Sequence, residues 1–364
     1  MPETSLKPES GSFQQYYKNC TLCPRNCGID RSVRQGLCGC GSTLKAARAG
    51  LHYYEEPFLS GTNGSGTVFF SGCSLGCIYC QNSPISRDGF GLEISEERLA
   101  QIFLEQQQRG AHNINLVTGT HFTPSIAKAL RDARAGGLTL PVVWNSSGYE
   151  KPETLQMLQG LVDIFLPDFK TMSSRLGQRY MKAPDYPEWA GKSLEAMVNM
   201  TGEAQFIPFG QDAADRNAAD TEDAGYEGEG VLMSSGVVVR HLVIPGQMED
   251  SKAVLRYLYE TYGDRIWISL MSQYTPVGVF AEELPAQVVT QNRDHKAVRE
   301  EMRRHYPELC RPVSYKEYDE AVDYAISLGI ENCMIQEDET ASDSFIPAFD
   351  GAGILPNIAE PATN

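Results

Sequence analysis

Residues 66–82 read GTVFFSGCSLGCIYCQN, a short apolar stretch that runs directly into three closely spaced cysteines. The nearly continuous apolar side chains of Gly66–Phe70 are typical of a strand covered on both faces. Cys73, Cys77 and Cys80 follow this strand at spacings of four and three. In folds built on parallel strands, the chemistry lies in loops at the carboxyl ends of the strands. The stretch therefore predicts a loop that carries ligands at the end of a buried strand.

Further apolar runs of the same kind recur along the chain and alternate with helical patterns. A βαβα succession predicts parallel strands in an α/β fold, either a doubly wound sheet or a barrel. The other predicted strands are Asn113–Val117, Leu140–Trp144, Val162–Leu166, Val237–Val243, Ile266–Leu270 and Cys333–Gln336.

Four of the predicted helices carry start signals. Ser95 is the expected N-cap of Glu96–Arg109, and Thr123 followed by proline is the expected N-cap of the next helix. A third helix is predicted over Ser251–Tyr262. Ser314 and Glu317 have the spacing of a capping box ahead of a fourth.

Three thiolates can surround one face of a cubane cluster and leave one iron without a protein ligand. That open iron can bind the amino and carboxylate groups of a small molecule. The alternatives are three buried cysteines or a zinc site. Zinc would require a fourth protein ligand and usually binds paired C-x-x-C knuckles.

The order C-x-x-x-C-x-aromatic-C, with Tyr79 in the aromatic position, resembles the signature of the radical SAM superfamily. Seven blocks of sequence make this resemblance more specific. They are SGCSLGCIYCQN, NLVTGTHFTP, WNSSGYE, DIFLPDFK, KAPDYPE, RHLVIPG and SLMSQYTP. Together they resemble the pyruvate formate-lyase activating enzyme-like group, and within it a branch with a CxLCPRxC amino-terminal segment. The similarity spans about residues 18–336.

This resemblance implies an incomplete (β/α)6 radical SAM barrel with an N-terminal cysteine-rich extension. It implies a [4Fe–4S] cluster on the cysteine triplet and cleavage of S-adenosylmethionine (SAM) to a 5′-deoxyadenosyl radical. The radical would remove a hydrogen atom from a backbone glycine of a glycyl-radical enzyme, and a flavodoxin- or ferredoxin-type protein would donate the electron. Two alternatives stay open. One is a radical SAM enzyme that acts on a small molecule, a peptide or RNA, and the other is a non-catalytic iron–sulfur or zinc protein that binds a partner.

The expected SAM-binding turn after the second strand departs from the superfamily. Members often carry a Gly-Gly-Glu stretch there, whereas this chain has Thr118, Gly119, Thr120 and His121 with no carboxylate. The first three are predicted to bind the SAM ammonium group, and His121 is predicted to face the substrate. A plain turn ahead of the following helix is the alternative.

Later strands supply the other predicted site residues. Asn145 and Ser146 are expected to bind SAM, with an ordinary Asn/Ser/Gly turn as the alternative. The resemblance places Asp168 and Lys170 at the reaction centre, where they fit a structural ion pair equally. Arg240 and His241 are consecutive residues in an otherwise apolar strand. Because side chains alternate along a strand, only one of them can point inward, and Arg240 is predicted as a SAM contact.

A second cysteine group lies near the amino terminus. Cys20, Cys23, Cys27 and Cys38 have spacings that fit either a zinc site or an auxiliary iron–sulfur cluster, and Cys40 is one thiol more than a tetrahedral site needs. Two further cysteines, Cys310 and Cys333, are expected to be ordinary half-buried residues.

Composition restricts the class of protein. The net charge of −16 disfavours a nucleic-acid partner. We see neither a secretory signal nor a long apolar run, so the expectation is a cytoplasmic protein without a membrane span. Thiols stay reduced in the cytosol, so the ten cysteines are not expected to form disulfides, and the clustering of eight of them within residues 20–80 indicates metal ligation.

The predicted organisation has three parts. Residues 1–60 form the N-terminal cysteine-rich, metal-binding extension and residues 61–336 the partial barrel. Within the barrel, residues 203–230 read as an acidic, flexible insertion. Residues 337–364 form a C-terminal tail.

Overall fold

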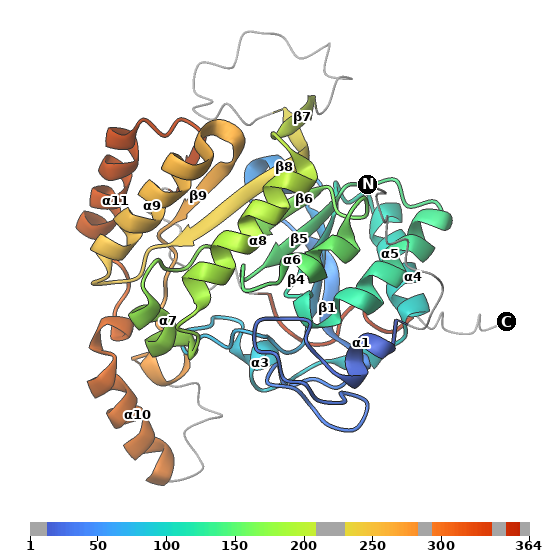
Figure 1. Ribbon diagram of the computed structural model, residues 1–364, viewed down its shortest axis with the longest axis horizontal. Helices are drawn as coiled ribbons and strands as arrows, with labels where there is room; N and C mark the ends of the chain where they lie inside the picture. The colour runs from blue at the N-terminus through green and yellow to red at the C-terminus, as the bar shows by residue number, and fades with distance from the viewer. Residues whose placement is uncertain (1–12, 209–229, 283–292, 337–346, 357–364) are drawn as a thin grey trace, which may run out of the picture.

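The computed structural model describes residues 13–208, 230–282, 293–336 and 347–356 (Figure 1). Most strands belong to one curved sheet in the order β10-β9-β8-β6-β5-β4-β2-β1-β3, and β7 pairs with β8 beside it. The strands are β1 (Leu44–His52), β2 (Ser65–Phe70), β3 (Leu92–Ile94), β4 (Ile114–Val117), β5 (Val142–Ser146), β6 (Ile164–Pro167), β7 (Gln205–Pro208), β8 (Val231–Leu242), β9 (Trp267–Met271) and β10 (Cys333–Ile335).

The sheet is mostly parallel, which confirms the α/β prediction. Strands β2, β4, β5, β6, β8, β9 and β10 pair in parallel, whereas β1, β3 and β7 pair antiparallel with their neighbours. Within the described residues the end strands β3 and β10 do not pair with each other, so the sheet is open. The parallel part contains seven strands there, so the expected count of six is not confirmed.

Helices join the parallel strands and cover the outer face of the sheet (Figure 1). The large helices α4, α5, α8, α9 and α11 lie around this face. The helices are α1 (Gln15–Lys18), α2 (Pro57–Ser60), α3 (Ser83–Ser86), α4 (Glu96–Gln108), α5 (Thr123–Ala135), α6 (Pro152–Leu155), α7 (Ser174–Met181), α8 (Tyr186–Thr201), α9 (Met248–Tyr262), α10 (Arg293–His305) and α11 (Tyr315–Leu328).

Two of the predicted helix starts are confirmed at the level of single hydrogen bonds. The Ser95 side chain accepts from the backbone N–H of Arg98, and Ser314 forms the full capping box with Glu317. The predicted N-cap at Thr123 is wrong. Thr123 is the first residue of α5, and its hydroxyl donates to the Thr120 carbonyl oxygen instead of capping.

The inner face of the sheet is filled at one end and hollow at the other. At the filled end, apolar side chains of β5, β6 and β8 pack against Phe58 and Leu59 from the segment that contains α2. Val143 of β5 belongs to this packed layer. Side chains of a strand alternate between faces, so Asn145, two residues further along β5, points to the same interior but nearer the carboxyl end.

Segments outside the parallel strands also contact the sheet. Strand β1 pairs antiparallel with β2, and residues 347–356 lie against β1 through backbone hydrogen bonds from Ala49 to Ala352 and from Gly351 to Ala47. Most of the predicted acidic insertion and much of the predicted C-terminal tail fall outside the described residues. The domain boundaries stay predictions.

Candidate functional site

A cavity of about 240 Å³ lies at the carboxyl ends of the parallel strands. All three cysteines of the triplet line it. The polar residues that line it follow or end successive strands, which explains how positions so distant in sequence come together. Six of the nine other predicted site residues are among them: Thr118, Asn145, Ser146, Asp168, Lys170 and Arg240.

The loop that holds the cysteines, residues 73–80 (the triplet loop), is shaped by Gly76 and anchored by Tyr79. Gly76 has a φ of +67°, a conformation that glycine adopts without steric cost. The Tyr79 side chain is buried and packs edge-on against the rings of Tyr180 and Tyr274. The aromatic position of the motif therefore ties the triplet loop to the protein core.

The donor set of the triplet loop fits an iron–sulfur cluster. The Leu75 N–H lies 3.4 Å from Cys73 Sγ, and the Ser86 hydroxyl lies 3.3 Å from Cys80 Sγ. Hydrogen bonds of this kind stabilise charge on thiolate sulfur. Burial raises the pKa of the Cys73 thiol and raises that of Cys77 to about 12, so metal binding would have to displace these protons.

The described residues do not show a preformed site for a single metal ion. Among them, no three His, Cys, Asp or Glu side chains form a group that could hold one ion. The sulfurs that ligate a cubane bind different iron atoms, so a cluster does not require the thiols to converge on one point. The fit at the triplet loop rests on the three thiols, their hydrogen bonds and the cavity that they share.

Thr118, at the end of β4, has a strained backbone. Its φ is +62°, in the left-handed region that β-branched residues rarely occupy. Its N–H donates to the Asn145 carbonyl oxygen over 2.8 Å, which extends the parallel pairing of β4 and β5 into the cavity wall. Strain of this kind persists where the surrounding structure imposes it, and it clusters at functional sites.

A buried carboxylate, Glu150, organises the polar wall beside Thr118. It accepts hydrogen bonds from Thr120 Oγ1 (2.8 Å), Trp144 Nε1 (2.9 Å) and Ser146 Oγ (2.5 Å). Burial raises its pKa above the ordinary value. Sequence reasoning missed Glu150, although it ends the block WNSSGYE.

Asp168 and Lys170 form an ion pair at the cavity wall. Lys170 Nζ lies 2.7 Å from Asp168 Oδ2. Burial lowers the pKa of Lys170, whereas the charges of Asp168 and the neighbouring Cys77 raise it. The charges outweigh burial, so the net pKa lies above the ordinary value. Tyr186 holds the two in place, since its hydroxyl accepts from the Lys170 N–H and lies 3.1 Å from the Asp168 carbonyl oxygen. Both members of the pair line the cavity.

Arg240 points into the cavity, and the alternation predicted for β8 is confirmed because His241 faces away. Arg240 binds Glu56 with two hydrogen bonds of 2.8 and 2.7 Å and also donates to Glu55. Sequence reasoning missed both carboxylates because they lie between β1 and α2, far from Arg240 in the chain. Burial opposes ionisation of Glu56, but Arg240 outweighs it and lowers the net pKa.

Three predicted site residues do not line the cavity. Gly119 packs against Trp144, so a Cβ there would lie 2.9 Å from the indole ring. Thr120 is bound to Glu150. His121 is buried behind the triplet loop, where its Nε2 donates to the Ser71 carbonyl oxygen over 2.8 Å. The geometry gives these three no direct contact with a molecule in the cavity.

The N-terminal cysteine group folds around a buried arginine. The Arg31 side chain lies between the rings of Tyr17 and Phe122 and donates to the carbonyl oxygens of Cys40, His121 and Gly41.

The cysteines at 20, 27 and 38 each influence the pKa of Cys23, which burial raises to about 12. A Cβ on Gly36 would lie 3.4 Å from Cys38 Sγ and 3.7 Å from Cys27 Sγ, and Cys20 Sγ lies 3.9 Å from Arg31 Nη1, so the predicted ligands share one region. Cys40 is directed elsewhere, with its Sγ 3.2 Å from the Ser71 carbonyl oxygen.

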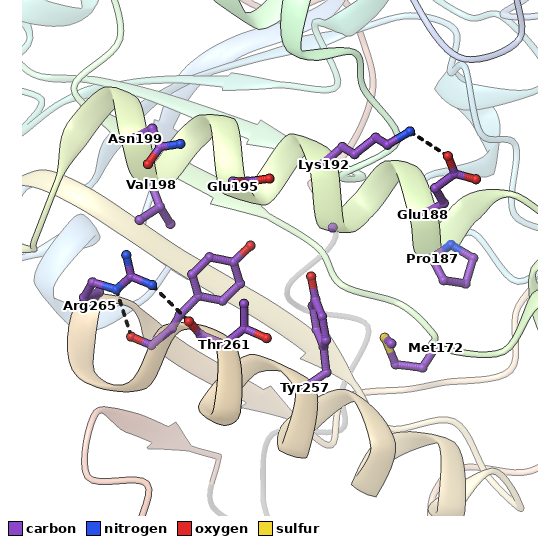
Figure 2. Close-up of a pocket in the computed structure, with 12 residues that line it drawn as sticks. Met172, Pro187, Glu188, Lys192, Glu195, Val198, Asn199, Tyr257, Thr261 and Arg265 are labelled. Atoms are coloured by element: carbon purple, nitrogen blue, oxygen red, sulfur yellow. Dashed lines mark hydrogen bonds and ion pairs between the residues drawn. The ribbon is translucent and has the colours of Figure 1, made fainter.

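A larger hollow of about 550 Å³ lies on the outer face of the protein between α8 and α9 (Figure 2). Figure 2 shows Tyr257 of α9 facing α8, with Lys192 and Glu188 paired at the rim. None of the ten cysteines lines this hollow. The smaller cavity therefore carries the candidate site.

Three comparisons relate the chain to known proteins. Residues 67–208 match the family model of the radical SAM superfamily. An uncharacterized protein of Methanocaldococcus jannaschii is 25% identical over 316 residues, which cover 85% of this chain and 75% of that protein. The crystal structure of methylornithine synthase superposes with a TM-score of 0.39 and 11% identity, over 74% of this chain and 71% of that chain.

None of the helices in the described residues is both long and apolar enough to cross a membrane.

Proposed function

We propose, on the premise that residues 67–208 form a radical SAM domain, that the chain holds a [4Fe–4S] cluster on Cys73, Cys77 and Cys80 and cleaves SAM reductively. The observation that carries this proposal is the shared cavity, which three thiols line together with polar residues from four strands. When bound there, the cluster supplies one electron that splits the sulfonium of SAM into methionine and a 5′-deoxyadenosyl radical.

The residues of the chain supply binding, orientation and exclusion of water. Thr118, Asn145 and Ser146 line one wall of the cavity, and we propose that their hydroxyl and amide groups bind the polar groups of SAM. Glu150 fixes the rotamer of Ser146, so that wall is set before a ligand arrives. Asp168 and Lys170 cancel each other's charge beside Cys77, which limits the electrostatic cost of a nearby charged ligand.

The first test is binding of SAM to the reconstituted protein. After anaerobic reconstitution we expect about four irons per triplet loop, and a SAM-dependent change in the electron paramagnetic resonance (EPR) spectrum of the reduced cluster. Cys77→Ala should lose both, and Cys333→Ala, outside both cysteine groups, should keep both. If the reconstituted wild type shows no spectral change with saturating SAM, the chain is a non-catalytic iron–sulfur or zinc protein instead.

For the substrate, we propose the backbone glycine of a glycyl-radical enzyme, with a flavodoxin- or ferredoxin-type protein as electron donor. The support is the set of ordered sequence blocks that resemble the pyruvate formate-lyase activating enzyme-like group. The test uses a partner enzyme deuterated at the α-carbon of glycine. Deuterium in the 5′-deoxyadenosine is the expected result, and the undeuterated partner should show a glycyl-radical EPR doublet. Unlabelled 5′-deoxyadenosine with this partner, together with deuterium transfer from a separately deuterated small molecule, would contradict this choice.

For the N-terminal cysteines, we propose a second metal centre, either zinc or an auxiliary iron–sulfur cluster, on Cys20, Cys23, Cys27 and Cys38. The support is that these cysteines share one region around Arg31. The buried positive charge of Arg31 offsets the negative charge of metal-bound thiolates. Metal analysis of the purified protein distinguishes the two kinds of centre.

A further inference from the structure

Arg25 lies between Cys23 and Cys27 and binds four backbone carbonyl oxygens with its guanidinium group. Arg25 Nε donates to Ser74 over 2.9 Å, and Nη2 donates to Leu75 over 2.9 Å. On the other side, Nη2 donates to Met181 over 2.7 Å and Nη1 to Lys182 over 2.6 Å. The side chain therefore joins the N-terminal cysteine group to two other parts of the chain.

The first part that Arg25 binds is the triplet loop itself. Ser74 and Leu75 lie between Cys73 and Cys77, and both are buried. Buried carbonyl groups require a hydrogen-bond donor, and a guanidinium group supplies charge-assisted hydrogen bonds in a fixed fork. Arg25 is thus the donor that holds the backbone between two of the proposed cluster ligands.

The second part is the end of α7, where the chain turns sharply. Lys182 has a φ of +51°, in the left-handed region. The Ile78 N–H donates to the Tyr180 carbonyl oxygen over 2.9 Å, so the end of α7 also binds the triplet loop directly. The face of the guanidinium group lies 5.2 Å from the ring centre of Tyr149, which restricts its rotation.

We propose that Arg25 is a positioning residue, which fixes the triplet loop between the N-terminal cysteine group and the end of α7 and so sets the geometry of Cys73 and Cys77. The proposal rests on the proposed function only for what the triplet loop holds. Lysine cannot take over this role, because an ammonium group is a single point donor and cannot bind four carbonyl oxygens in one plane.

The test begins with the metal-free protein, so that it does not depend on the cluster. Hydrogen–deuterium exchange is measured by mass spectrometry for wild type, Arg25→Gln and Arg25→Lys. We expect exchange of peptides covering residues 73–80 to rise about tenfold or more in Arg25→Gln, since charge-assisted hydrogen bonds to buried carbonyls are lost. Arg25→Lys should show a smaller rise in the same peptides.

The matched control is Arg134→Gln. Arg134 also donates to two backbone carbonyl oxygens, those of Leu138 and Leu140, but at the opposite end of the sheet. Its exchange should rise near residues 138–140 and stay at the wild-type level in residues 73–80. Circular dichroism shows whether each variant folds. If Arg25→Gln does not fold, the exchange of Arg25→Lys decides.

Reconstituted protein gives the second reading. Arg25→Gln should bind SAM at least about tenfold more weakly and show an altered EPR line shape, while Arg134→Gln behaves as wild type. Wild-type exchange in residues 73–80 of both Arg25 variants would overturn the proposal. If no protein assembles a cluster, the proposed function fails, and the exchange data still decide the role of Arg25.

Discussion

The backbone N–H of Cys73 donates a hydrogen bond to the carbonyl oxygen of Cys38 over 3.1 Å. The first cysteine of the triplet loop is therefore bound directly to a proposed ligand of the N-terminal group. A Cβ on the neighbouring Gly72 would lie 2.5 Å from that same carbonyl oxygen and from Cys40 Sγ, so only glycine allows this approach. The two cysteine groups form one packed unit, although about thirty residues separate them in the sequence.

The metal content of a triple variant separates the two groups. Replacing Cys73, Cys77 and Cys80 together by alanine should remove the triplet-loop cluster and leave the metal of the N-terminal group. Elemental analysis for iron and zinc, with acid-labile sulfide, measures what stays bound. Cys310→Ala, at a half-buried cysteine outside both groups, serves as the control. A triple variant that binds neither metal would count against the N-terminal centre.

Thr118→Gly should separate stability from activity. Glycine adopts a φ of +62° without the steric cost that threonine bears, so the free energy of unfolding should stay constant or rise by about 1 kcal/mol. SAM binding should weaken, because the cavity loses the threonine hydroxyl. Urea unfolding and SAM titration measure the two effects.

Thr62→Gly is the matched control, since Thr62 is exposed and lacks a positive φ. There glycine only adds freedom to the unfolded chain and should cost up to about 1 kcal/mol. A larger loss of stability at Thr118 than at Thr62 would show that Thr118 is not strained.

Arg240→Met should destabilise the fold strongly. It leaves the carboxylates of Glu55 and Glu56, whose side chains are only 5% and 4% exposed, without their cation. Removing one partner from a buried ion pair costs about 3–5 kcal/mol. Adding Glu56→Gln to the same chain should recover part of this loss, because one uncompensated charge is removed.

Lys192→Met provides the comparison at a surface pair with Glu188, whose side chains are 49% and 63% exposed. Exposed pairs contribute about 0–1 kcal/mol, so the change in urea unfolding should be small. Equal losses for Arg240→Met and Lys192→Met would mean that the ion pairs of Arg240 with Glu55 and Glu56 are exposed to water.

His121→Gln should reduce the acid sensitivity of the fold. Burial lowers the pKa of His121 to about 3, well below the ordinary value of a histidine. The unfolded chain therefore binds a proton that the folded chain does not, so stability is complete above about pH 6.5 and is lost as the pH falls toward 3. The loss is at most about 1.4 kcal/mol per pH unit.

Glutamine keeps an N–H group for the Ser71 carbonyl oxygen but does not titrate. The variant should lose less stability than wild type between pH 7 and pH 5, as measured by urea unfolding. His241→Gln should act in the same direction, because burial lowers the pKa of His241 to about 4. Parallel losses in wild type and both variants would contradict neutral, buried histidines.

The parallel strands could be predicted because burial on both faces leaves a continuous apolar signal. All seven predicted strands are present, although β5 begins at Val142 rather than Leu140 and β8 begins at Val231 rather than Val237. Strands β1, β3 and β7 were missed, and the reason is clearest for β1. Its sequence LKAARAGLH is rich in alanine and glycine, which have low strand propensity, and it is held by its pairing with β2 and β3.

The site was predictable where it follows strand ends and unpredictable where it depends on tertiary contacts. Asn145 and Asp168 reach the cavity because each ends or follows a parallel strand. No local pattern indicates that Glu55 meets Arg240, since that contact exists only once the segment before α2 enters the sheet interior. His121 was misplaced for a related reason, because the turn after Thr118 directs its side chain behind the triplet loop.

The most direct measurement is formation of 5′-deoxyadenosine from SAM and dithionite by the anaerobically reconstituted protein, followed by mass spectrometry. The wild type and Cys333→Ala are expected to release 5′-deoxyadenosine together with methionine, and Cys73→Ala, Cys77→Ala and Cys80→Ala are expected to release none. A fully reconstituted wild type that forms no 5′-deoxyadenosine, or a Cys77→Ala variant that forms as much as wild type, would contradict radical cleavage of SAM at the triplet loop.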